Sequence, residues 1–263
     1  MFSKISSLIF IFISSFFYQP NEDECQKPGA NKNVKNAIEQ MHLEYRYGIE
    51  NKNQNTNTPS ILCEKKYFST LSNGKLKITS DGHKKNRTEL KQNSKHPNSL
   101  DKNSKIIFAG KISDVPSSKI EKEYENGITI AQIHNRGYDV KTPLVKVVVS
   151  ENSKKIMTIF SDGYSKSDPK KQINCLKFNN NDHIEVTLEI TGNQNTINVI
   201  LKNTTQKMKF QDKFKIPSTS NWLEFKDQFY YKTGIYQQIS GSKPTIEYDY
   251  IKLIEVSRYF HIL

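Results

Sequence analysis

About a dozen short β-type runs, separated by turn residues, constrain this chain more than any other feature of its sequence. The runs are rich in β-branched and aromatic residues, and almost no stretch shows the periodicity of an amphipathic helix. The 263 residues contain no internal repeat and divide most simply into one domain. The pattern therefore predicts an all-β fold, a single-domain sandwich or jelly roll.

Hairpins give the clearest local signals. Residues 67–71 and 75–79 flank Asn73 and Gly74, and an Asn-Gly pair between two alternating runs is a strong hairpin signal. A second hairpin is expected from 184–190 and 196–202, with its turn at Gly192. Further strands are expected at residues 106–112, 144–149, 154–161, 207–214 and 245–256, and residues 164–172 are expected to form a loop.

The N-terminus has the pattern of a secretory signal peptide. Lys4 precedes an apolar run from Leu8 to Phe17, which is shorter than the roughly 20 residues that span a bilayer. We therefore expect residues 1–20 to be a signal peptide on a secreted, extracellular protein without stable membrane insertion; an N-terminal anchor is the alternative. Residues 21–60 are expected to be a polar segment with one short helix, and residues 61–263 the β-jelly-roll domain.

Net charge and cysteine content limit the binding partners, disulfides and metal sites that can be expected. The net charge of +12 indicates either a polyanionic partner or a lysine-rich solubilising surface. Cys25, Cys63 and Cys175 allow one disulfide in an oxidising compartment, and its pairing stays open. The sequence has no Cys-x-x-Cys or His-x-x-x-His pair, so no metal site is expected.

Three segments far apart in the chain each place polar side chains on one face of an expected strand. Successive residues of a strand point to opposite faces, so every second residue shares a face. The residues on these polar faces are Arg87, Glu89 and Lys91 in the first segment, Gln132 and His134 in the second, and Tyr230, Lys232, Gly234, Tyr236 and Gln238 in the third. If the three strands lie side by side, these faces form one charged groove.

The three segments resemble, in order and spacing, the signature motifs of the alginate lyases of polysaccharide lyase family 7. They read Arg-Thr-Glu-Leu-Lys at 87–91, Gln-Ile-His at 132–134 and Tyr-Tyr-Lys-Thr-Gly-Ile-Tyr-Gln-Gln at 230–238. The resemblance covers most of the chain from about residue 60. It implies a concanavalin-like two-sheet jelly roll with a substrate groove on the concave sheet. It also implies β-elimination on a uronate polymer, giving 4,5-unsaturated ends, with neither metal nor cofactor.

The chemistry of this elimination explains the residue types. The reaction removes the C5 proton of a uronate and expels the C4 oxygen, while negative charge grows on the neighbouring carboxylate. A cation and a neutral donor must stabilise that charge, and Arg87 and Gln132 fit this role. His134 fits the general base, and Tyr236 can protonate the leaving oxygen. The residues expected to bind substrate or support the site are Glu89, Lys91, Lys232 and Gln238, with Glu89 pairing with Lys91 or orienting Arg87.

Stereochemistry divides these roles by substrate. In guluronate the proton and the leaving group lie on opposite ring faces, so base and acid must be separate groups. In mannuronate they share a face, and Tyr236 can serve as both. The resemblance associates Gln-Ile-His with guluronate-containing substrate. The family pattern usually has Arg at Lys91, Ala at Thr233 and Asn at Gln237, and the change at Lys91 puts a bidentate carboxylate contact in doubt.

Other readings remain open from the sequence. A lectin-like binder of anionic polysaccharide would keep the groove, and another polyuronate such as glucuronan can replace alginate as substrate. A glycosidase needs two carboxylates about 5–10 Å apart, and only Glu89 is suitably placed. No aromatic-plus-basic motif supports nucleic-acid binding. Trp222 is expected in the core, and the protein is expected to be a monomer.

Overall fold

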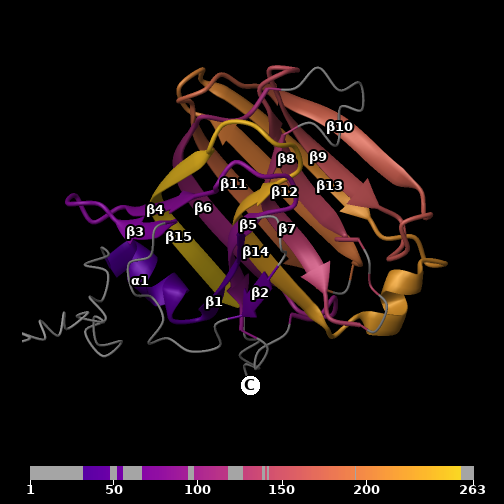
Figure 1. Cartoon of the computed structure of the whole chain (residues 1–263). Coiled ribbons are helices and arrows are strands. Elements are labelled where there is room, and N and C mark those ends of the chain that lie inside the picture. Colours follow the sequence, from indigo (N-terminus) through magenta and orange to yellow (C-terminus); the bar gives the residue numbers. More distant parts are fainter. Residues whose placement is uncertain are drawn as a thin grey trace, which may run out of the picture.

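The computed structural model describes residues 32–47, 52–55, 67–93, 98–117, 127–137, 140, 142–192 and 194–255. The expected signal peptide, Cys25 and Cys63 lie outside these residues. The described chain forms two antiparallel sheets packed face to face, which confirms the predicted all-β jelly roll (Figure 1). Its helices are α1 (Lys32–Ile38) and the short 3-10 helix η3 (Asn221–Phe225). Within the described residues, no helix has the length and apolar character to cross a membrane.

The larger sheet contains all three motif segments. Its spatial order is β10 (Lys170–Lys177), β9 (Lys155–Ser161), β8 (Val145–Ser150), β7 (Ile128–Asn135), β14 (Phe229–Gln237), β5 (Arg87–Gln92), β1 (Met41–Tyr47) and β2 (Lys52–Asn55). The motif strands β7, β14 and β5 are therefore adjacent, although they are far apart in sequence.

The smaller sheet covers the other side of the core. Its spatial order is β13 (Met208–Lys215), β12 (Thr196–Asn203), β11 (His183–Thr191), β6 (Ser104–Ser113), β15 (Thr245–Glu255), β4 (Leu76–Thr79) and β3 (Phe68–Thr70). Both expected hairpins are confirmed, since β3 pairs with β4 and β11 pairs with β12. Gly74 in the first turn has a φ of 77°, which glycine adopts without steric cost.

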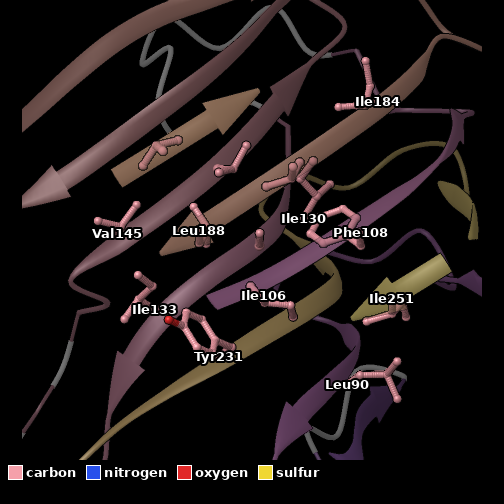
Figure 2. Packing of buried hydrophobic residues seen from close by; sticks show 14 of the residues in the cluster. Leu90, Ile106, Phe108, Ile130, Ile133, Val145, Ile184, Leu188, Tyr231 and Ile251 are labelled. Atoms are coloured by element: carbon pink, nitrogen blue, oxygen red, sulfur yellow. The ribbon is translucent and has the colours of Figure 1, made fainter. Parts of the chain in front are cut away.

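Apolar side chains from both sheets fill the space between them. Ile133 and Tyr231 of the larger sheet pack toward Ile106 and Leu188 of the smaller one (Figure 2), and all four are fully buried. Each motif strand thus turns one face to this core and leaves the alternate residues for the opposite face. Trp222 on η3 is also fully buried, as predicted.

The strand β10 was not predicted. From the sequence, residues 164–172 were expected to form a loop and no strand was expected between residues 172 and 184, whereas β10 covers Lys170–Lys177 and pairs with β9. Half of the residues of this edge strand are exposed, and a bulge between Asn174 and Leu176 interrupts its register. Its main-chain hydrogen bonds, rather than an alternating apolar pattern, hold it in the sheet.

The N-terminal boundary also differs from the prediction. The polar segment expected at residues 21–60 includes α1, β1 and β2, and β1 pairs with β5 from Met41 to Arg46. Met41 and Leu43 of β1 are buried in the core. The sandwich therefore begins well before residue 61, because one face of this largely polar segment carries enough apolar side chains to complete the sheet.

Gly234 is the position in the motif strands where a side chain is least tolerable. Its φ is 140°, and a Cβ added there would lie 2.4 Å from the carbonyl oxygen of Thr88 and 2.6 Å from the Cα of Glu89. We expect Gly234→Ala to lower the free energy of unfolding by about 2 kcal/mol or more, measured by denaturant unfolding. Gln211→Ala, at an exposed position of edge strand β13, should change it by less than about 0.5 kcal/mol. Equal stability of the two variants would contradict the close approach.

Candidate active site

Strand pairing brings the three motif segments together on one face of the larger sheet. In β14, Lys232 lies opposite Lys91 of β5 on one side and opposite Gln132 of β7 on the other. Tyr236 lies opposite Arg87. The groove expected from the alternation of polar residues therefore has its side chains in neighbouring strands, as predicted.

Glu89 is the centre of the polar network on this face. Its Oε1 accepts a hydrogen bond from Gln132 Nε2 at 2.5 Å, and its Oε2 lies 3.2 Å from Lys232 Nζ and 3.6 Å from Arg87 Nη1. Glu89 is only 2% exposed, so these donors replace the water that would otherwise solvate its charge. Glu89 was expected either to orient Arg87 or to pair with Lys91. The geometry fits the first role, and the lysine that pairs with Glu89 is Lys232.

Glu44 of β1 is a second carboxylate in the network, and it was not predicted from the sequence. Its Oε1 accepts from Arg87 Nη1 at 3.1 Å, and its Oε2 accepts from Lys232 Nζ at 2.7 Å. Burial alone would raise the pKa of Glu44, but Lys232 and Arg87 hold it at about 2. Glu44 is therefore ionised at neutral pH and bridges two of the cations predicted to serve the site.

The position of Lys232 differs from the substrate contact expected of it. The residue is 3% exposed, and both acceptors of its ammonium are carboxylates of the protein. Burial tends to lower its pKa, whereas Glu89 and Glu44 raise it, so the side chain stays charged. Lys232 thus supports the floor of the groove beneath the exposed side chains.

His134 lies on the groove face and is partly exposed, not turned into the core. Its ring stacks on Tyr230, with 5.5 Å between the ring centroids. Its Nδ1 lies 3.0 Å from the carbonyl oxygen of Asn135. Burial, together with the nearby charge of Lys232, lowers the pKa of His134 to about 4. The imidazole is therefore neutral at physiological pH and able to accept a proton.

Tyr236 and His134 are offset from each other along the strand direction of the larger sheet. Tyr230 pairs with His134, whereas Tyr236 pairs with Thr129, and a bulge interrupts the register between the two points. Four residues of β7 lie between Thr129 and His134, so the backbone positions opposite Tyr236 and Tyr230 are about 15 Å apart. Gly234 lies between Tyr236 and Lys232 in β14 and has no side chain. A sugar bound over this bare stretch would lie between the phenol and the imidazole.

Arg87 and Tyr236 form a close pair at the other end of this stretch. The guanidinium carbon lies 4.4 Å from the centre of the phenol ring, a cation–π contact that fixes both side chains. The Nε of Arg87 is buried and has no hydrogen-bond partner among the residues that the structure describes.

Comparison with known proteins decides the family. The family model described as alginate lyase matches residues 32–258, most of the chain. The chain belongs to the alginate lyase family. It is thus a polysaccharide lyase, a carbon–oxygen lyase that acts on alginate. The match begins at residue 32, in agreement with the place of β1 in the sheet.

Solved structures of alginate lyases share the fold of this lyase. Alginate lyase A1-II', a member of polysaccharide lyase family 7, has a TM-score of 0.64 at 17% identity, covering 88% of this chain and 99% of that one. AlyC3 has a TM-score of 0.70 at 13% identity, covering 88% and 96%. PA1167 from Pseudomonas aeruginosa has a TM-score of 0.65 at 13% identity, covering 83% and 99%. No curated protein sequence matches the chain.

The remaining motif residues of the lyase divide between the groove and its support. Lys91 is partly exposed, with its ammonium 4.9 Å from the centre of the Tyr230 ring, and Gln238 is partly exposed and donates to Thr129 Oγ1. Both can therefore meet a bound polymer. Gln237, by contrast, is fully buried and accepts from Ser80 Oγ at 2.7 Å, so the departure from the family pattern at this position concerns packing.

A cavity of about 880 Å³ opens on the groove face of the lyase. Gln132, Tyr236 and Gln238 line it on the side of the motif strands, and the cavity extends over β8 and β9 to β10. Its size is that of sites for ligands larger than one sugar ring. Among the described residues, no group of three or more His, Cys, Asp or Glu side chains is arranged to hold a metal ion.

Proposed function

We propose that this lyase is secreted, acts as a monomer and cleaves guluronate-containing alginate by β-elimination, leaving 4,5-unsaturated uronate ends. The observation that carries the proposal is the gathering of Arg87, Gln132, His134 and Tyr236 on one face of three adjacent strands. Among proteins of this fold, A1-II' has been crystallised with the substrate GGMG, and AlyC3 with dimannuronate.

Arg87 and Gln132 neutralise the substrate carboxylate as the reaction proceeds. Arg87 has five guanidinium N–H donors, of which those on Nη1 contact Glu44 and Glu89, and the amide nitrogen of Gln132 gives only one of its two hydrogens to Glu89. Both groups therefore retain donors for an oxyanion. Because Glu89 and Glu44 already fix the guanidinium, little reorganisation is needed when charge develops.

His134 removes the C5 proton in this mechanism. His134 Nδ1 lies 2.8 Å from the backbone nitrogen of Asn135 and 3.0 Å from its carbonyl oxygen. The proposed role requires the tautomer in which Nδ1–H donates to this carbonyl, because Nε2 then carries the free lone pair. The electrons of the C5–H bond form the C4–C5 double bond, and the bond between C4 and the glycosidic oxygen breaks. The hydroxyl of Tyr236 gives its proton to the departing oxygen. Base and acid act from opposite ends of the bare stretch at Gly234, as the geometry of guluronate requires.

A second assignment has support from the spacing along the sheet. About 15 Å separates the backbones of His134 and Tyr236, so a ring held close to the phenol can lie beyond the reach of the imidazole. Tyr236 would then both remove the proton and protonate the leaving group, which suits mannuronate. This alternative keeps the same reaction and changes the preferred block of the polymer.

The ultraviolet absorbance of the unsaturated product tests the proposal. We expect absorbance to rise with polyguluronate and with mixed alginate, and to rise less with polymannuronate or glucuronan. A faster rise with polymannuronate would favour the assignment to Tyr236 alone, and a faster rise with glucuronan would move the substrate to another polyuronate. Binding of alginate by folded protein with no absorbance change would identify a lectin-like protein instead.

A further inference from the structure

Lysines line the part of the cavity that lies beyond the motif strands. The members of this basic arm are Lys84, Lys85, Lys146, Lys166 and Lys170. Asp168 is the one carboxylate among the described residues that line the same cavity, and its Oδ2 accepts from the backbone N–H of Ser165 at 2.7 Å. The basic arm thus has five cationic residues against one anionic residue, and none of the five belongs to the residues assigned to the reaction.

The loop that carries two of these lysines is fixed to the end of β14. The backbone N–H of Lys85 donates to the carbonyl of Gln237 at 2.7 Å, and that of Lys84 donates to Ser240 Oγ at 3.0 Å. The side chains of Lys84 and Lys85 are nevertheless exposed. The backbone is therefore held beside Tyr236 while the ammonium groups remain accessible to a ligand.

A second loop forms the opposite wall of the basic arm. The backbone N–H of Asp162 donates to the carbonyl of Pro169 at 3.0 Å, and Lys170 Nζ donates to the carbonyl of Lys166 at 2.7 Å. These bonds close the loop on itself, and the side chain of Lys166 is exposed. Two fixed loops on either side of an extended cavity make a built channel, in contrast to lysines scattered over a surface.

We infer that the basic arm binds the free carboxylates of consecutive uronate residues next to the one that reacts. The inference rests on the proposed function and adds the subsites on the β8–β10 side of the groove. The cavity has room for an oligosaccharide, and each uronate carries one carboxylate that a lysine can meet. Because these contacts are made far from the reacting bond, they stabilise substrate and transition state equally and lower KM without raising kcat.

The test compares two triple variants with the same loss of charge. The groove variant combines Lys84→Gln, Lys85→Gln and Lys166→Gln. It should raise the KM for the cleaved alginate about tenfold, with kcat changed less than about twofold. The control replaces Lys209, Lys213 and Lys215 by Gln. These residues are exposed on β13 of the other sheet and do not line the cavity, so KM should stay close to that of the unchanged protein.

Calorimetric binding of saturated uronate oligomers separates this inference from the proposed function. If binding weakens in the groove variant and not in the control, the inference holds even where no cleavage is found. Equal weakening in both variants would show that net charge alone attracts the polymer and would overturn it. Unchanged KM and affinity in the groove variant of an active lyase would overturn it as well. The difference between the variants should also shrink at high salt, because exposed charges are screened.

Discussion

Tyr236→Phe should lower kcat at least about a thousandfold on every polymer that the lyase cleaves. The substitution removes one oxygen, and the ring that packs under Arg87 at 4.4 Å remains. Without the hydroxyl, no group at this position can protonate the departing oxygen. The affinity for substrate should change little, since Arg87, Gln132 and the basic arm are untouched. Cleavage is followed by product absorbance, and affinity by calorimetry with saturated oligomers.

Replacing His134 by Ala distinguishes the two mechanisms. If His134 is the base for guluronate, the His134→Ala variant loses cleavage of polyguluronate while any activity on polymannuronate survives. Wild-type kcat/KM on polyguluronate should then fall with acid as His134 becomes protonated, with a midpoint near pH 4, because the depressed pKa keeps the imidazole neutral above that value. Full activity of Tyr236→Phe, or a His134→Ala variant that cleaves polyguluronate normally, would contradict the assigned roles. Thr205→Ala, at an exposed position outside the groove, is a control for handling and folding.

The sequence was sufficient to assign the faces of the motif strands, because the alternation of side chains along a strand is a local property. Arg87, Gln132 and Tyr236 could be assigned to one face without knowing which strands are neighbours. Their order across the sheet depends on pairing between distant segments, which local patterns do not encode. The same limit applies to the offset between His134 and Tyr236, which follows from the register and from the bulge near Gly234.

The residues that the sequence analysis missed are those placed by long-range pairing alone. Glu44 belongs to a segment without a motif, and only the pairing of β1 with β5 sets it opposite Glu89. The strand β10 begins with two lysines, which have low β-propensity, so its pairing with β9 outweighed local preference. If the pairing of β1 with β5 had been known, Glu44 could have been found as a carboxylate within reach of two predicted cations.

Glu44→Gln should impair both the stability and the catalysis of the lyase. The carboxylate neutralises Arg87 and Lys232 together, and an amide offers one acceptor oxygen and places N–H groups against cations. Because Lys232 keeps Glu89 as a partner, we expect the free energy of unfolding to fall by about 2 kcal/mol, less than for a fully broken buried pair. Arg87 would lose the contact that fixes its guanidinium, so kcat should fall about tenfold or more.

The pH profile of Glu44→Gln separates a role in the site from a role in stability alone. The negative charge of Glu44 raises the pKa of His134, against the opposing effects of burial and Lys232. Removing that charge must lower this pKa further, so the acidic limb of kcat/KM should move to lower pH. Glu185→Gln, which breaks a more exposed ion pair with Lys202 on the other sheet, should leave the limb in place. If both variants lose stability and neither shifts the limb, Glu44 holds the sheet together and does not act on the base. A shift confined to Glu44→Gln would instead mean that strand β1, outside every motif, sets the charge at which the site works.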